Sequence, residues 1–405
     1  MVLSDRQYVV IAAANSTDAL KARADVVCSG EHDEQVIQAV IDRCARERLD
    51  VLLLNGIYHI DGFYDRGDGG PKAALCFPNN RQEMAFVGQR KPYGRESGVI
   101  LYVTAQALEQ IDGEGYDVIR TTWTPCGLGN GSALVLENMD VRLSHNQKPV
   151  RCVDLRRCDR PELKNIGLNA YHDMPAGLGK PPAMPVKGCI GLTMTDGSNA
   201  FYSNYTDVSA NGFWEGIQVG GEHVVMINCA ANMNYYGYTF GNYELKNGAN
   251  HPITMINCMD ERNVNLPLFN SCGDSDLNGN RMQGNQEVTM IGFNIEHIAA
   301  QAPGQKHERR MQEVFPGTWK GNIEFTVQPA WNHLNIVDFQ LWENDGSGSG
   351  FKTRNNCHKT VCSTEERMSY YPTLGQQVFD TDLNKMVVCI DPATKKWTDF
   401  LGNEV

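Results

Sequence analysis

The sequence contains little that would mark an exported or membrane-anchored protein. Residues 1–18 lack the basic segment and the long apolar stretch that together make a secretory signal. No run in the chain approaches the ~18 consecutive apolar residues of a membrane-spanning helix. We therefore expect a cytoplasmic protein, or one carried in a phage particle that is released by lysis, and no membrane partner.

The motifs of several enzyme classes are also missing. The chain has no Gly-rich phosphate loop, no Gly-x-Ser-x-Gly elbow and no paired Cys-x-x-Cys motif. Its 13 cysteines are an odd number without framework spacing, and Cys229 and Cys258 lie at apolar positions of expected strands. Cys357, His358 and Cys362 lack a second pair of ligands, so zinc is not expected. The sequence predicts free, buried thiols in a reducing compartment.

Positive charge is in deficit. The formal net charge is −12, and an acidic surface repels the phosphate backbone of nucleic acids. Nucleic acid is therefore not an expected partner. A neutral sugar is compatible with this charge, and a strongly anionic one is less so.

The N-terminal region carries a helix followed by two strands. Apolar residues at positions 36, 37, 40 and 41 have helical spacing, and the acidic pair Asp33 and Glu34 suits a helix N-terminus. Residues 51–54 then form a buried strand, and residues 57–60 a second one after an Asn-Gly turn. This order resembles the opening of pectate-lyase-like parallel β-helix proteins. The resemblance implies that the helix covers the open end of a solenoid and prevents edge-to-edge pairing.

The middle of the chain contains a short repeat. Its copies begin at Tyr205, which fits more loosely, and at Ile227, Ile256, Ile291 and Val337. The steps between them are 22, 29, 35 and 46 residues, whereas one coil of a solenoid takes roughly 20–25 residues. The longer steps predict loops on one side, or one extra coil in the last step. A second short strand follows several copies, at residues 216–219, 237–240 and 267–269.

These patterns predict an all-β fold, namely a right-handed parallel β-helix with an N-terminal capping helix and a small C-terminal β-hairpin module. We expect the cap and first coils in residues 1–60, the β-helix body with loop insertions in residues 61–344, and a linker with the hairpin module in residues 345–405. The signature F-D-T-x-L-N-K … K-W-x-D at residues 379–399 resembles end modules of phage tail fibres and other β-helix proteins.

The repeat also predicts an outward column of side chains. Strand residues alternate between faces, and we take Ile227, Cys229 and Ala231 as inward. The residue five positions after the start of each copy then points outward, which gives the column Ala210, Asn232, Glu261, Glu296 and Trp342. Stacked strands are ~4.7–4.9 Å apart, so Glu261 and Glu296 should lie side by side.

Two neighbouring carboxylates are typical of glycoside hydrolases. Their repulsion raises one pKa and keeps a proton available for general acid catalysis. Retaining enzymes hold the carboxyls ~5–5.5 Å apart and inverting ones ~6.5–9.5 Å. We therefore predict Glu261 and Glu296 as acid and nucleophile or base, in undetermined order; ordinary solvated glutamates are the alternative.

Several neighbours complete the predicted site. Asp260 has inward parity, and a buried carboxylate requires a partner such as Arg262; we expect Asp260 to support the catalytic pair. His297 adjoins Glu296 and would orient a group or shuttle a proton, unless it is an ordinary surface histidine. The residues expected to bind sugar are Asn232, Arg262, His297, Trp342, Trp214 and Tyr236.

A calcium site is a second hypothesis. Asp274, Asp276 and Asn278 follow the start of the calcium-loop pattern D-x-D-x-N-G, whose oxygens suit a hard cation. The twelfth position is Asn285 rather than a bidentate glutamate. A plain polar turn is the alternative, and no other cofactor is expected.

The resemblance to the pectate-lyase-like superfamily implies an oligosaccharide or polysaccharide ligand, but the fold does not determine the reaction. The first hypothesis is a glycoside hydrolase or an intramolecular glycosyl transferase of the fructosyl type. The second is a calcium-assisted polysaccharide lyase or epimerase. The third is a non-catalytic, tailspike-like glycan-binding protein. The resemblance also suggests a homotrimer.

Overall fold

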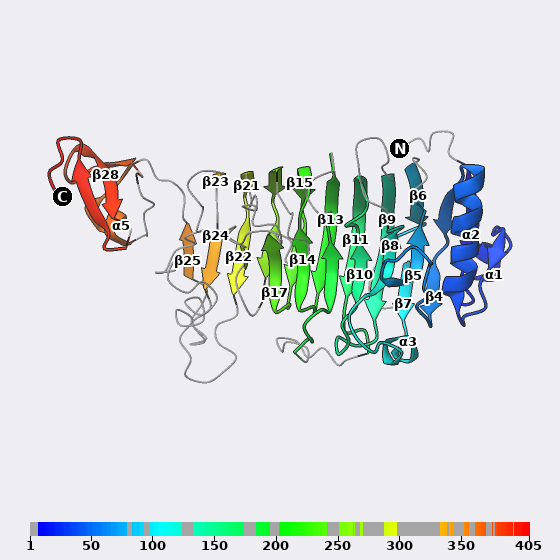
Figure 1. Cartoon of the computed structure of the whole chain (residues 1–405). Helices are drawn as coiled ribbons and strands as arrows, with labels where there is room; N and C mark the ends of the chain where they lie inside the picture. The colour runs from blue at the N-terminus through cyan, green and yellow to red at the C-terminus, as the bar shows by residue number, and fades with distance from the viewer. Residues whose placement is uncertain are drawn as a thin grey trace.

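The computed structural model of the chain describes residues 7–78, 83–92, 98–123, 133–173, 184–194, 202–240, 251–261, 263, 268–269, 287–297, 333–337, 340–343, 352–355, 361–369, 375, 377–391 and 393–405. These residues are mostly β-strand, and most strands belong to two long sheets with parallel pairing. The strands follow one another along one axis, from helix α2 (Asp33–Glu47) at one end to β25 (Lys352–Asn355) at the other (Figure 1).

Sheet 1 is the larger of the two. Its neighbouring strands pair in parallel, apart from the antiparallel pair of β24 and β25. Within the described residues it contains β1 (Tyr8–Ala12), β2 (Val26–Val27), β3 (Asp50–Leu53), β4 (Gly56–Ile60), β6 (Glu83–Gly88), β7 (Val99–Val103), β9 (Ala133–Leu143), β11 (Arg160–Asn169), β13 (Asn204–Asn211), β15 (Glu222–Ile227), β16 (Ala230–Asn232), β18 (His251–Ile256), β19 (Met259–Glu261), β21 (Glu287–Ile291), β22 (Asn294–His297), β23 (His333–Val337), β24 (Gln340–Glu343) and β25.

Sheet 2 is parallel throughout its described strands. It contains β5 (Lys72–Phe77), β8 (Tyr116–Thr121), β10 (Arg151–Asp154), β12 (Ile190–Thr193), β14 (Glu215–Val219), β17 (Tyr236–Phe240) and β20 (Leu268–Phe269). Each of β14, β17 and β20 follows strands of sheet 1 in the chain. The predicted second strands of the repeat are therefore confirmed.

The repeat itself is confirmed by the strand register. Ile227 pairs with Ile256, which pairs with Ile291, and Ile291 pairs with Val337. Because β21 pairs directly with β23, the 46-residue step places no extra coil between these two strands. Of the two predicted explanations for this step, one extra coil is therefore ruled out.

One part of the predicted alternation was wrong. Ile256 is 36% exposed and Ile291 is 39% exposed, so the isoleucines that begin the copies point outward, whereas Cys229 and Ala231 are buried as predicted. The reason is a bend after each isoleucine. Asn228 has a φ of 54° and Asn257 a φ of 51°, and this left-handed conformation interrupts the alternation of the strand.

The left-handed bend recurs along the stack because asparagine and aspartate tolerate it. Asn138, Asn165 and Asp207 have φ values of 59°, 58° and 55° at neighbouring levels of the bend. Side-chain amides connect the levels: Asn165 donates to Asn138 at 2.9 Å, and Asn257 donates to Asn228 at 2.8 Å. The bend thus has its own hydrogen-bond ladder outside the sheets.

Helix α2 packs on the N-terminal end of the stack, as predicted. Its residues Ile37, Ile41 and Cys44 are fully buried in the common core. The buried Asp33 carboxylate accepts the backbone N–H groups of Gly30 at 2.8 Å and His59 at 2.9 Å, which ties the start of the helix to β4. Two shorter helices, α1 (Asp18–Lys21) and α3 (Ala105–Glu109), lie in connections near this end.

The C-terminal residues form a separate four-stranded sheet, which confirms the predicted hairpin. It contains β26 (Val361–Cys362), β27 (Gln377–Asp380), β28 (Lys385–Asp391) and β29 (Lys396–Asp399), with helix α5 (Thr364–Ser369). β27, β28 and β29 are antiparallel neighbours. The Arg367 guanidinium is buried, contacts Asp380 at 2.8 Å and lies 5.2 Å from the centre of the buried Trp397 ring.

Among the helices in the described part of the chain, none combines the length and the apolar character that a bilayer-spanning segment needs. The predicted buried, free thiols are confirmed for nine cysteines of the described residues, Cys229 and Cys258 included. The predicted domain boundaries stay predictions.

Candidate functional site

A continuous column of register partners, which we call the outward column, runs along sheet 1; its described side chains are half-buried except that of Arg142, which is buried. Strand register places its members at successive levels, in the order His59, Tyr102, Arg142, Asn169, Asn211, Asn232, Glu261, Glu296 and Trp342. Each member is polar or aromatic. The column one residue earlier is apolar apart from Asp260, and its members from Tyr58 to Asp260 are buried. It reads Tyr58, Leu101, Val141, Leu168, Ala210, Ala231, Asp260, Ile295 and Leu341.

The central members of this column are the residues that the sequence singled out. Glu261 pairs with Asn232 on one side and with Glu296 on the other, and Glu296 pairs with Trp342. The two glutamates are therefore register neighbours on adjacent parallel strands. Glu261 is half-buried. The side chains of Glu296, Trp342 and the adjoining His297 lie outside the described part.

The first member of the predicted column was wrong. Asn211, not Ala210, pairs with Asn232, and Ala210 is buried. The alignment at Tyr205 was shifted by one residue, because Thr206 is the partner of Ile227. The buried Tyr205 was equated with an isoleucine that in fact faces outward. The corrected column gains a second asparagine.

Asp260 is inward and fully buried, as its parity predicted. The Asn263 side-chain amide donates to its Oδ1 atom at 2.7 Å. The suggested partner Arg262 lies outside the described residues and stays a prediction. Burial raises the pKa of Asp260 to about 7 despite this hydrogen bond. Asp260 thus lies on the face of β19 opposite to Glu261, and its support of catalysis stays a prediction.

Buried asparagines shape the corner that follows the column. The Asn234 side chain accepts the backbone N–H of Phe213 at 2.9 Å and donates to the carbonyl of Ala210 at 3.1 Å. One level later, Asn263 accepts the backbone N–H of Asn234 at 2.7 Å and donates to the carbonyl of Ala231 at 2.8 Å. The same corner is therefore built twice, and the chain leaves each column position in the same way.

Aromatic residues follow directly after this corner. Trp214 lies three residues after Asn211, and Tyr235 lies three residues after Asn232. Their rings stack with centroids 3.9 Å apart and an interplanar angle of 9°. Tyr236 meets Tyr235 edge to face at 4.9 Å, and all three rings are half-buried. The rings of Trp214 and Tyr236 thus belong to one aromatic cluster, and their role in binding sugar stays a prediction.

Sheet 2 carries a row of charges that the sequence did not reveal. Asp117 is fully buried, 3.7 Å from Arg151, and Asp154 is buried, 2.6 Å from Arg156. The guanidinium of Arg156 also lies 4.7 Å from the centre of the Trp123 ring. Burial and the neighbouring Asp154 carboxylate raise the pKa of Asp117 well above its ordinary value. Burial acts to raise the pKa of Asp154, but the Arg156 guanidinium lowers this pKa to about 2.

Opposite pKa shifts of two neighbouring carboxyls are typical of an acid and a base. However, Asp117 is 0% exposed and Asp154 is 1% exposed, so in this structure a ligand has no access to either. The outward column of sheet 1 is the better candidate for binding.

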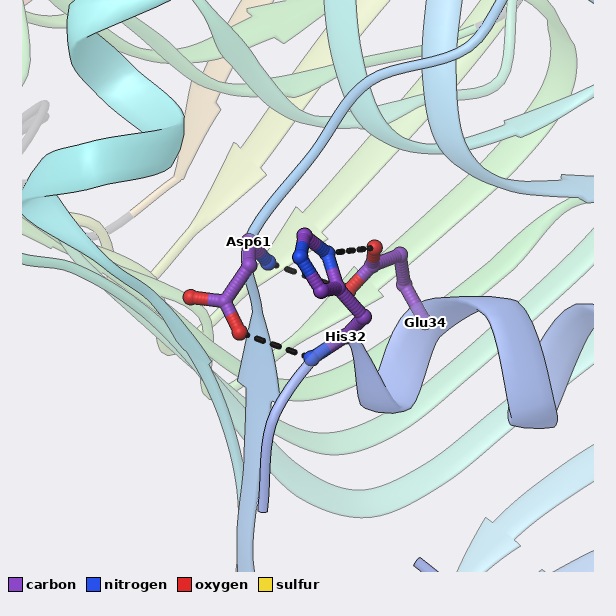
Figure 2. A group of neighbouring side chains, drawn as sticks. All are labelled: His32, Glu34 and Asp61. Carbon is purple, nitrogen blue, oxygen red and sulfur yellow. Dashed lines mark hydrogen bonds and ion pairs between the residues drawn. The ribbon is translucent and has the colours of Figure 1, made fainter. Parts of the chain in front are cut away.

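A third group joins His32, Glu34 and Asp61 beside helix α2 (Figure 2). These are ligand types that metals use, but protein hydrogen bonds occupy them. Asp61 Oδ2 accepts the backbone N–H of His32 at 2.8 Å, and Glu34 accepts the backbone N–H of Asp61 at 3.0 Å and the hydroxyl of Tyr64 at 2.7 Å. The group connects the start of α2 to the segment that follows β4. The predicted calcium residues Asp274, Asp276 and Asn278 lie outside the described residues.

No protein-family profile and no curated protein sequence matches the chain. Two solved structures align with it. One is ORF18 of Geobacillus virus E2, with 13% identity and a TM-score of 0.30 over 64% of this chain and 36% of that one. The other is tailspike protein 3 of bacteriophage CBA120, with 9% identity and a TM-score of 0.16 over 91% of this chain and 67% of that one. The chain thus spans little more than a third of the Geobacillus virus protein.

Proposed function

We propose that the protein is a right-handed parallel β-helix of the pectate-lyase-like type and acts on a carbohydrate chain bound along the outward column of sheet 1. The observation that carries this proposal is the unbroken register of polar and aromatic residues, with Glu261 and Glu296 on adjacent levels. An extended glycan presents hydroxyl groups at regular intervals, and a column repeated at every strand offers a partner to each.

The proposed reaction is hydrolysis or intramolecular transfer at a glycosidic bond. Parallel strands are ~4.7–4.9 Å apart, and retaining glycosidases hold their carboxyls at ~5–5.5 Å. Register neighbours such as Glu261 and Glu296 can adopt either this or the wider inverting separation through their side-chain torsions. One carboxyl would protonate the leaving oxygen, and the other would attack the sugar or activate water.

The remaining groups would hold the substrate. Asn211 and Asn232 supply amides that donate to and accept from sugar hydroxyls. The half-buried rings of Trp214, Tyr235 and Tyr236 offer apolar faces and edges to the C–H surface of a pyranose or furanose ring. A sugar at the level of Asn232 would thus have polar groups on one side of the corner and aromatic rings on the other.

The test is product formation from a panel of oligosaccharides, followed by mass spectrometry and by NMR of the anomeric configuration. We expect Glu261→Gln and Glu296→Gln each to reduce turnover by at least ~10³-fold, because each removes a group that the reaction requires. Glu162→Gln is the matched control, since Glu162 is exposed on β11 of the same sheet. Full turnover in both column variants would disprove the catalytic proposal.

A second candidate is a glycan-binding protein without catalysis, as in a tailspike-like fibre. The length of the column favours it, because polar and aromatic residues extend far beyond the two glutamates, from His59 to Trp342. A catalytic pair alone does not require so long a row. Binding that depends on Asn232 and Trp214, with no product after long incubation, would support this candidate over the first.

A further inference from the structure

We infer that the N-terminal end of the outward column is a second sugar-binding subsite, centred on Tyr102 and Asp173, which takes a neutral, hydroxyl-rich unit of a long glycan. This inference rests on the proposed function, because it assigns the far end of the same ligand. It concerns residues that lie well away from Glu261 and that the sequence did not suggest.

The subsite is built by the ends of successive strands. Beyond the end of sheet 1, backbone hydrogen bonds continue the ladder: Ser144 donates to Val103 at 2.9 Å, His172 to Leu143 at 2.9 Å, and Asp173 to Ser144 at 3.2 Å. Asp173 is therefore held at the level after Ser144, rather than on a loosely attached loop.

Side chains converge on Asp173. Its Oδ2 atom accepts the hydroxyl of Tyr102 and, at 2.7 Å, that of Ser144. The Tyr102 ring meets His172 edge to face with centroids 5.1 Å apart, and it meets His59, its register neighbour, at 5.7 Å. An aromatic group with polar rims thus surrounds an exposed carboxylate.

Within the described residues, the hydrogen bonds to Asp173 use only one of its two carboxylate oxygens. Partial burial acts to raise the pKa of Asp173. The pKa nevertheless lies below its ordinary value, because Tyr102 and Ser144 donate hydrogen bonds to the carboxylate and His172 is nearby. Burial and Asp173 raise the pKa of Tyr102 to about 12. At neutral pH the phenol is therefore neutral and the carboxylate ionised. No described residue donates to Asp173 Oδ1, which can accept one or two sugar hydroxyls in charge-assisted bonds.

The same charges indicate a neutral ligand. The nearest guanidinium along the column is Arg142, which is 8% exposed and bound to Asp140 at 2.7 Å. It is therefore engaged, and the exposed Asp173 carboxylate would repel a uronate, sulfate or phosphate group.

The position predicts a dependence on glycan length. Five strand spacings separate the levels of Tyr102 and Glu261, which is ~24 Å along the sheet. A short oligosaccharide can occupy one end of the column only, whereas a long one can contact both. Asp173 should therefore contribute to the binding of long glycans and not of short ones bound near Glu261.

The experiment is calorimetric titration with size-fractionated neutral oligosaccharides from the panel, using unmodified protein, Asp173→Asn and the control Glu162→Gln. Asp173→Asn preserves shape and removes the charge, so we expect the affinity for long oligosaccharides to fall about tenfold or more, which is the worth of a hydrogen bond to a charged group. Affinity for short ones should not change. Glu162→Gln removes an exposed carboxylate of β11 that lies outside the column, so this variant should bind long oligosaccharides as the unmodified protein does.

Unchanged affinity of Asp173→Asn for long oligosaccharides would overturn the inference. If Asn232→Ala still weakened both lengths, the proposed function would stand without the subsite. If no oligosaccharide of any length bound to the unmodified protein, both proposals would fail. Should Asp173→Asn not fold, NMR of the unmodified protein decides: long oligosaccharides, and not short ones, should shift the imidazole signals of His59 and His172, and the absence of these shifts would refute the subsite.

Discussion

At the scale of single residues, two adjacent acids of β19 have opposite environments. Glu261 points outward beside Asn232 and Glu296, whereas Asp260 is buried against Asn263. The sequence alone separates them, because strand parity requires one of two successive residues to face inward. Parity alone could not identify Asn263 as the partner, since that contact depends on how the chain turns the corner after β19.

Asp260→Asn should remove a pH dependence of stability. The folded-state pKa of Asp260 is raised to about 7 by burial, and the unfolded value is ~3.9. A raised pKa means that the stabilising contribution is complete below pH ~4 and is lost as the pH rises through ~7. Between pH ~4 and ~7, the free energy of unfolding of the wild-type protein should fall by up to about 4 kcal/mol relative to that of the variant.

The measurement is urea unfolding of both proteins between pH 4 and 8. The variant should be the more stable protein at pH 8, and the difference should vanish near pH 4. Parallel pH profiles for the two proteins would show that Asp260 does not titrate in this way. A loss of turnover in a variant of normal stability would instead support its predicted role beside the glutamates.

At the scale of elements, the recurring bend of sheet 1 decides which residues reach the surface. The φ of 51° at Asn257 costs ~1–2 kcal/mol for most side chains, but less for asparagine and least for glycine. Asn257 also donates to Asn228 at 2.8 Å. The bend and its ladder therefore depend on the residue type at this exposed corner.

Asn257→Ala should lower the free energy of unfolding by about 1–2 kcal/mol, because alanine is strained in the left-handed region and lacks the amide. Asn257→Gly is the control, since glycine relieves the strain and loses only the hydrogen bond that the Asn257 side-chain amide donates to Asn228. Thermal unfolding of both variants checks the difference. Equal destabilisation by alanine and glycine would mean that the ladder, and not the backbone conformation, carries the effect.

The sequence was sufficient to predict the capping helix, the first strands, the repeated strands from residue 205 onward and the C-terminal hairpin. It did not predict the individual strands β5 to β12 or the direction of every side chain. Helical spacing and the Asn-Gly turn gave α2, β3 and β4, and the repeats from Ile227 onward gave the correct strand pairing. The isoleucines were assigned to the core because they are apolar. Only the backbone bend at Asn228 and Asn257 explains why they face outward.

At the scale of the whole molecule, parallel stacking turns a local pattern into a long surface. One position, repeated from β4 to β24 along the strands that Figure 1 shows stacked on one axis, forms a row of polar and aromatic residues. Few short motifs in the sequence would reveal this row. The part near Glu261 and Glu296 was predicted because its copies look alike. The part near Tyr102 was not, because β7, β9 and β11 differ in sequence and length from the later copies.

The most direct test of the account is a crystal structure with an oligosaccharide selected from the panel by affinity. The account predicts that the sugar chain lies along the column of sheet 1, with the carboxyls of Glu261 and Glu296 on either side of one glycosidic bond and ~5–9.5 Å apart. A sugar bound on another face, or carboxyls farther apart than one sugar can bridge, would contradict it.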